Sequence, residues 1–117
     1  MSTIVKTRLL ILDTGNTCHG LASRLDKAGF CVVRINDFAD YMLFAAQFNP
    51  EIILVNSSDK LPNDVESFAQ CTDTVVLQLC DDASKIRTHN NSLSQPMQSV
   101  LNTLIPLCQG YPFNKNN

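Results

Sequence analysis

A chain of 117 residues has room for one domain with one hydrophobic core, because domains commonly contain about 100–150 residues. Apolar residues make up 44% of the sequence and charged residues 17%, a composition that builds a packed interior and excludes a disordered chain. The formal charge is only −2, and the nine Lys and Arg are scattered, so we expect no direct binding to nucleic acid or to a membrane surface. No stretch approaches the roughly 20 apolar residues of a membrane span, and the first residues lack a signal-peptide pattern, so we expect a cytoplasmic protein.

The cysteines are odd in number and show neither C-x-x-C nor metal-ligand spacing. They are Cys18, Cys31, Cys71, Cys80 and Cys108. We interpret them as reduced thiols that act as small buried hydrophobic side chains, since free cysteine is among the most buried residue types. We therefore expect neither a metal site nor a redox role.

The first half of the chain alternates between predicted strands and helices. A continuous apolar run that ends in turn-forming residues predicts a strand over residues 8–12. Apolar residues at helical spacing, followed by Gly29, predict an amphipathic helix over residues 17–28. A second strand is expected over residues 30–35, followed by a helix from Phe38 to Ala46 that ends before Asn49-Pro50.

The second half continues the pattern less clearly. A third strand is expected over residues 52–55, ending at Asn56, and a short helix through Val65 and Phe68 leads to a fourth strand over residues 74–79. Beyond it we expect a turn or two of helix over residues 83–88, a short fifth strand over residues 92–94 and a final helix over residues 97–108. Residues 1–109 then form the domain, and residues 110–117 form a flexible tail or linker.

Strands that alternate with helices predict an α/β fold, a doubly wound parallel sheet with helices on both faces. Ligands and chemistry in such sheets lie at the carboxyl ends of the strands. The residues expected at those ends are Asp13, Thr14, Asn56, Cys80 and Gln95. Asp13 also has a purely electrostatic interpretation, as a carboxylate beside a helix N-terminus.

Three segments together resemble the receiver domain of response regulators, and the resemblance covers residues 8–108. They are Leu10-Ile11-Leu12-Asp13-Thr14, Leu21 through Val32, and Phe48-Asn49-Pro50-Glu51-Ile52-Ile53-Leu54-Val55-Asn56. The resemblance implies a three-layer flavodoxin-like sheet with five parallel strands in the order 2-1-3-4-5. It also implies a pocket of five groups: two acids that hold Mg²⁺, an aspartate nucleophile, a hydroxyl residue and a lysine.

Only one of those five groups is present, which is Asp13. Thr14 stands in place of the second acid, Asn56 in place of the nucleophile, Cys80 in place of the hydroxyl residue and Gln95 in place of the lysine. An amide is a poor nucleophile, and a glutamine carries no charge to meet a phosphoryl group. We expect weak Mg²⁺ binding and no phosphate acceptance at Asn56, and we interpret Asp59 as a solvated turn residue.

The segment from Leu79 to Ala83, with Ile86-Arg87, is similar to the receivers of nitrate-regulator-type antiterminators, which carry an RNA-binding domain after the receiver. Only 14 residues separate Cys80 from Gln95, so the fourth helix is expected to be shortened or lost. The family's surface for dimerisation and output therefore cannot be transferred directly to this chain.

Flavin binding is the alternative of a different class. Thr14-Gly15-Asn16-Thr17 resembles part of the FMN phosphate loop of flavodoxins, whose sheet has the same strand order. Leu12 stands where the motif needs its first hydroxyl, and neither later loop offers an aromatic residue to stack on a flavin. The two histidines, His19 and His89, are interpreted as surface or loop residues.

The sequence thus predicts a phosphorylation-independent pseudo-receiver that is not an enzyme and has no cofactor. Its expected partner is another protein, a fused output domain or a second copy of the chain, and the resemblance implies a role in two-component signalling or in transcription or antitermination control.

Overall fold

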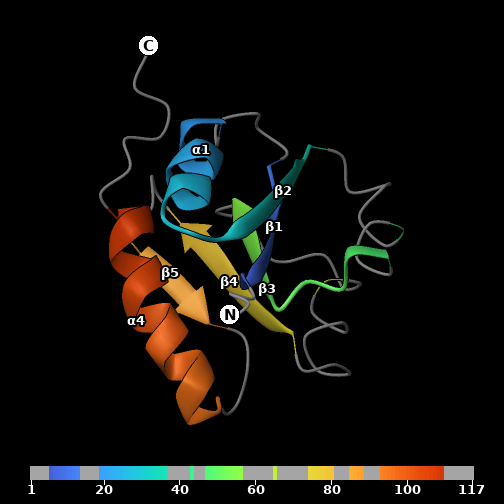
Figure 1. The fold of residues 1–117 in the computed structure, drawn as a ribbon. Helices are drawn as coiled ribbons and strands as arrows, with labels where there is room; N and C mark the ends of the chain where they lie inside the picture. The colour runs from blue at the N-terminus through green and yellow to red at the C-terminus, as the bar shows by residue number, and fades with distance from the viewer. Residues whose placement is uncertain are drawn as a thin grey trace, which may run out of the picture.

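The computed structural model describes residues 6–13, 19–36, 43, 47–56, 65, 74–80, 85–88 and 93–109. Within these residues it contains one sheet and two extended helices (Figure 1). The elements are β1 (Arg8–Leu12), α1 (His19–Lys27), β2 (Cys31–Ile35), β3 (Ile52–Asn56), β4 (Val75–Cys80), β5 (Lys85–Thr88) and α4 (Gln95–Gln109). The helices expected over residues 38–46 and around residues 65–68 lie mostly outside the described residues, although Leu43 and Val65 have helical backbone.

The five strands form a single sheet in the order β2-β1-β3-β4-β5. The pairs β1–β2, β1–β3 and β3–β4 are all parallel, with Leu12 beside Ile35 on one side and beside Val55 on the other. The order of all five strands and the parallel arrangement of the first four agree with the sequence prediction. The overall class, a mixed α/β fold, follows from this arrangement.

The fifth strand differs from the prediction in both place and direction. It covers Lys85–Thr88, where a turn or two of helix was expected, and it pairs antiparallel with β4, with Ile86 beside Leu79. Four residues separate Cys80 from Lys85, whereas a parallel crossover needs about a dozen or more. The short connection therefore permits only an antiparallel neighbour, and no helix stands between β4 and β5 in the order of described elements.

Two apolar layers cover the two faces of the sheet. On one face α1 and α4 pack through Leu21, Leu25, Leu101 and Leu104 against strand residues such as Leu77, all fully or almost fully buried. On the other face a smaller cluster includes Leu10, Ile53 and Val76, with Val65 and Phe48 packed on it. Both faces of the central strands are covered, which explains why these strands are continuous apolar runs rather than alternating ones.

The two described helices run in opposite directions on their shared face. Nη1 of Arg24 on α1 donates a hydrogen bond of 2.9 Å to the carbonyl oxygen of Leu107, near the end of α4. A cavity of about 210 Å³ lies at the other end of the pair, lined by Thr7, Gly29, Val100 and Thr103, among others. Because Thr7 precedes β1, this end of the helix pair lies at the amino ends of the parallel strands, and α4 begins beyond it (Figure 1).

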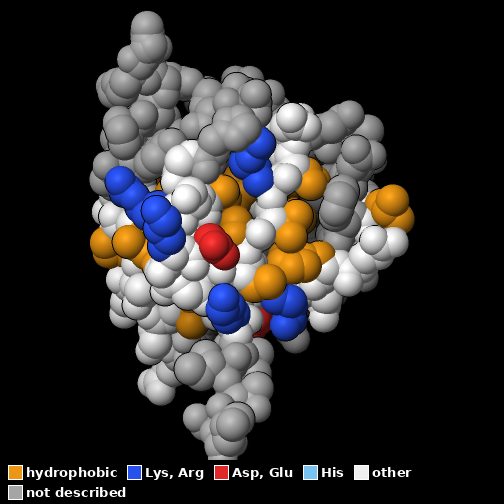
Figure 2. Space-filling model, turned by 45° about the horizontal axis from the view of Figure 1, so that its top comes forward, with side chains coloured by type: hydrophobic (Ala, Val, Ile, Leu, Met, Phe, Trp, Pro, Cys, Tyr) orange, Lys and Arg blue, Asp and Glu red, His pale blue; other side chains and the backbone are white. Residues whose placement is uncertain are grey.

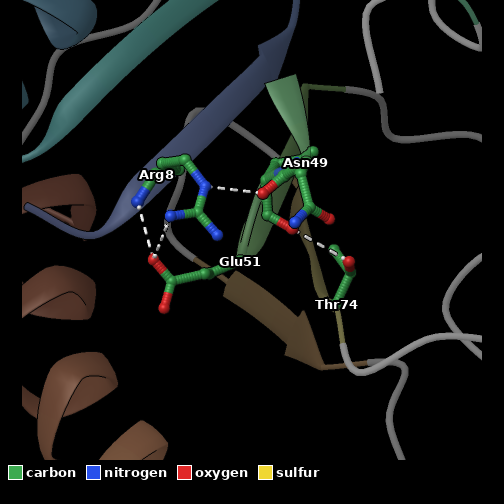
Figure 3. A network of polar contacts seen from close by, with 5 residues as sticks. Arg8, Asn49, Glu51 and Thr74 are labelled. Atoms are coloured by element: carbon green, nitrogen blue, oxygen red, sulfur yellow. Dashed lines mark hydrogen bonds and ion pairs between the residues drawn. The ribbon is translucent and has the colours of Figure 1, made fainter. Parts of the chain in front are cut away.

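A polar network fixes the amino ends of β1, β3 and β4 (Figure 3). The backbone N–H of Arg8 donates to Oε1 of Glu51 at 3.1 Å, and Nε of Arg8 donates to the carbonyl of Asn49 at 2.7 Å. The hydroxyl of Thr74 donates to the carbonyl of Pro50 at 2.9 Å. Asn49 has a φ of 52°, a left-handed conformation that asparagine tolerates better than most residues.

Candidate functional site

The carboxyl ends of β1 and β3 bring two of the predicted site residues side by side. Leu12 pairs with Val55, so the next residues, Asp13 and Asn56, follow in the same register on neighbouring strands. Alternation along the strands places both on the face that α1 and α4 cover, because Ile11 and Leu54 belong to that layer. Asp13 and Asn56 therefore lie on adjacent strands at the same edge of the sheet.

Asp13 is fully buried, and its carboxylate is paired with an arginine. Nη1 of Arg34 on β2 lies 3.1 Å from Oδ2 of Asp13, within both hydrogen-bond and ion-pair distance. The side chain of Asp13 has an exposed fraction of 0%, and that of Arg34 has 22%. The backbone N–H of Asp13 also donates to the carbonyl of Ile35 at 2.8 Å, which extends the β1–β2 ladder by one residue. A buried carboxylate needs such compensation, because an isolated charge is costly to remove from water.

The residues at this edge do not fit the Mg²⁺ ion that the resemblance implies. A divalent cation of this kind is bound by carboxylate oxygens, often together with several water molecules. The carboxylate of Asp13 is already neutralised by a guanidinium and has no exposed surface, and Asn56 offers an uncharged amide. Among the described residues, no group of three or more His, Cys, Asp or Glu is placed to hold a metal ion. We therefore derive no chemistry through a metal here.

Gln95 lies away from this edge of the sheet. It is the first residue of α4, and α4 passes Val100 and Thr103 at the amino-end cavity before it reaches Leu107 near Arg24. The cause is the direction of β5, because an antiparallel fifth strand carries the chain to the amino ends of β1–β4. Gln95 therefore lies at the opposite end of the molecule from Asp13.

The remaining predicted positions are described only in part. Cys80 is the last residue of β4, which agrees with its predicted place at a strand end. Thr14, Asp59, His89 and the loop over residues 14–17 lie outside the described residues. His19 is the first residue of α1. The candidate site therefore consists, in the described part of the chain, of Asp13, Asn56 and the unpredicted Arg34.

Arg34 and Gln78 are the two residues that sequence reasoning passed over. Residues 30–35 were interpreted simply as an apolar strand, although Arg34 is the one charge in the run Cys-Val-Val-Arg-Ile. A cation inside an apolar strand predicts either an ion pair or an exposed position, because its charge has to meet a countercharge or reach solvent. Gln78 likewise interrupts the apolar residues of β4 and has an exposed fraction of 2%. Its strand neighbours in register are Val55 and Arg87.

Cys108 behaves as a buried hydrophobic side chain. It is fully buried between α4 and the sheet, and burial raises the pKa of its thiol to about 12, partly opposed by the nearby positive charge of Arg24. Cys31 on β2 is half-buried, and both cysteines carry free thiols. The interpretation of the cysteines as small buried residues is confirmed for Cys108.

Charged side chains of the described residues are dispersed on the face drawn in Figure 2. Figure 2 shows Lys and Arg side chains in several separate places on one face, with apolar side chains between them. Neither described helix combines the length and apolar character that a bilayer crossing demands.

Comparisons with known proteins identify no relative of this chain. No family model matches it, and neither the curated proteins nor the solved structures contain a significant match. The function is therefore inferred from the fold and from the residues at the carboxyl ends of the strands.

Proposed function

We propose that this chain is a pseudo-receiver, a regulatory protein-interaction module of flavodoxin-like topology that works without phosphorylation. The observation that carries the proposal is the Arg34–Asp13 ion pair, at 3.1 Å, at the end of β1, with Asn56 at the end of the neighbouring strand β3. Support comes from the location of these residues at the carboxyl ends of the first and third strands of a sheet with the order 2-1-3-4-5, because ligands of such sheets bind at these ends.

The chemistry of the site argues against a phosphoryl acceptor. Phosphoryl transfer is mostly positioning and charge neutralisation, so it needs a nucleophilic oxygen and cations arranged around the transferred group. Asn56 supplies an amide in place of that oxygen, and the one described guanidinium at this edge is engaged with Asp13. Gln95, at the far end of the molecule, contributes nothing to the site.

A signalling module of this kind acts through its surface. The partner we propose is a protein or a fused output domain, such as the RNA-binding or DNA-binding part of an antitermination or transcription regulator. Scattered surface charges and a formal charge of −2 support protein contacts rather than direct nucleic-acid contacts by this segment.

Intact-mass measurement after incubation with acetyl phosphate and Mg²⁺ tests the proposal. The wild-type protein should show no phosphoryl adduct, and neither should the Asn56→Asp variant, because the single substitution restores the oxygen without the surrounding charges. An adduct on the wild-type chain would overturn the proposal. An adduct on Asn56→Asp alone would show that the site retains the transfer geometry and that Asn56 by itself blocks the reaction.

A further inference from the structure

We infer that the outer edge of β5 binds an acidic, extended peptide segment of a partner protein, which adds to the sheet as a further strand. β5 is the last strand in the order β2-β1-β3-β4-β5, and in the described part of the chain it pairs with β4 alone (Figure 1). The inference deepens the proposed function and rests on it for the kind of partner, which is a protein. It adds the surface that the partner contacts and the chemistry that this surface selects.

The first step of the argument is the direction of the backbone polar groups on β4. The N–H of Val75 donates to the carbonyl of Glu51 at 3.0 Å, so Val75 and every second residue after it turn their backbone groups towards β3. Gln78 lies in the other set and turns its backbone groups towards β5. Its partner in register on β5 is Arg87, so these two residues exchange the hydrogen bonds of the antiparallel pair.

The second step is the set of backbone groups that this pairing leaves on the outside of the sheet. Because the groups of Arg87 point towards β4, those of its two neighbours, Ile86 and Thr88, point outwards. Among the described residues, none forms a hydrogen bond with these outward groups. Thr88 is exposed, and Ile86 is half-buried against the layer formed by α1 and α4. An edge with open donors and acceptors is a template for an added strand.

The third step is the charge of β5, which decides between a second copy of the chain and a different partner. The strand reads Lys-Ile-Arg-Thr, with two basic residues and no acidic one. Two copies that pair antiparallel through Ile86 and Thr88 place Arg87 opposite Arg87, and a pairing centred on Ile86 places Arg87 opposite Lys85. Like charges directly opposite each other destabilise a strand pair, whereas opposite charges stabilise it. The edge therefore disfavours a second copy and selects a segment with Asp or Glu opposite the exposed Arg87.

The test titrates the protein, at low ionic strength, with a short peptide of alternating valine and glutamate and reads the amide NMR signals of Ile86 and Thr88. Alternation places the carboxylates on the face of Arg87 and the valines opposite Ile86 and Thr88. Saturable shifts and slower amide exchange are expected at both residues. A peptide of alternating valine and lysine should bind roughly tenfold more weakly. The glutamate peptide with N-methylated valines should not bind, because it has lost the N–H groups that face the edge.

Two variants separate the backbone contribution from the charge. Thr88→Pro removes an outward N–H that the β4–β5 ladder does not use, so the sheet should persist while peptide binding is lost. Arg87→Glu should reverse the preference, so that the lysine peptide binds more tightly than the glutamate peptide. The matched control is Lys27→Glu, which reverses an exposed charge on α1 and should leave both affinities unchanged.

The absence of saturable shifts at Ile86 and Thr88 with the glutamate peptide would overturn the inference, and so would equal affinities for the glutamate and lysine peptides. Concentration-dependent protection of these two amides in the free protein would show that a second copy occupies the edge, which would equally contradict it. If Thr88→Pro fails to fold, the Arg87→Glu result decides by itself. A phosphoryl adduct on the wild-type chain would instead contradict the proposed function and leave the peptide result interpretable.

Discussion

Nη1 of Arg34 lies 3.1 Å from Oδ2 of Asp13 and thereby joins the edge strand β2 to the end of β1. The contact is made at the carboxyl end of β1. It adds a side-chain link to the backbone hydrogen bond between Asp13 and Ile35 at the same point. The side chain of Arg34 therefore links the edge strand β2 to β1 in addition to pairing with the buried carboxylate.

Removal of Arg34 alone should destabilise the fold more than removal of both charges of the pair. Arg34→Gln should lower the free energy of unfolding by about 3 kcal/mol, because it removes a cationic partner from a fully buried carboxylate. The double variant Asp13→Asn/Arg34→Gln should be more stable than Arg34→Gln alone, since no charge is then left buried. Urea unfolding followed by circular dichroism measures both, with Arg87→Gln on β5 as an exposed control that stays within about 0.5 kcal/mol of wild type. A double variant that is less stable than Arg34→Gln would refute this account of the pair.

The hydrogen bond from Arg24 to the carbonyl of Leu107 should contribute to docking of α4. Arg24→Met keeps much of the apolar stem but removes the 2.9 Å bond, so we expect a loss of about 1 kcal/mol. Hydrogen exchange in the last turn of α4 should also become faster. Lys27→Met, in the same last turn of α1 but exposed, serves as the control. Equal stability of the two variants would mean that the bond contributes nothing measurable.

Burial of Cys108 makes a contribution to stability that depends on pH. The folded pKa of its thiol, about 12, lies above the ordinary value of 9.0, so the folded state holds the proton more strongly than the unfolded chain does. This contribution is fully present below pH 9 and should decline by about 1.4 kcal/mol per pH unit as pH rises towards 12. Cys108→Ala should remove this slope, so the stability difference between wild type and variant should shrink above pH 9. A difference that is constant from pH 8 to about 11 would contradict the assignment.

The left-handed backbone of Asn49 should limit which residue types this position tolerates. Asn49→Gly should change stability little, because glycine adopts a positive φ without strain. Asn49→Val should cost about 1–2 kcal/mol, since a β-branched side chain clashes in that conformation. Thermal unfolding of the two variants separates the effects. A valine variant as stable as the glycine variant would show that the loop changes conformation to avoid the strain.

The strands from β1 to β4 could be predicted from the sequence because each is a short apolar run bounded by turn-forming residues, and both faces are covered. The neighbouring positions of Asp13 and Asn56 followed from this, since parallel strands end at a common edge. The position of α4 was also close to the prediction, starting two residues earlier than the expected Met97.

The fifth strand could not be predicted from the same rules. Lys-Ile-Arg-Thr has one apolar residue, Ile86, and a short exposed edge strand needs no more than one to contact the core. Such a pattern does not distinguish a strand from a helical turn. The direction of the fifth strand also decides where Gln95 lies. A loop lies at the end of the sheet to which the preceding strand runs, so an antiparallel strand puts Gln95 at the opposite end from the one expected. The Arg34–Asp13 pair was missed because it depends on register between β1 and β2, which the sequence alone does not show.

The most direct test of the central claim, that the site at the strand ends works without phosphate, is a comparison of amide NMR spectra with and without Mg²⁺ and beryllofluoride. Beryllofluoride imitates a phosphoryl group on a carboxylate, and a ligand shifts a two-state equilibrium only through different affinities for the two states. The account predicts unchanged amide shifts at Asp13, Arg34 and Asn56 across the titration. A saturable shift at these residues that requires both additions would contradict it and would identify the chain as a working receiver.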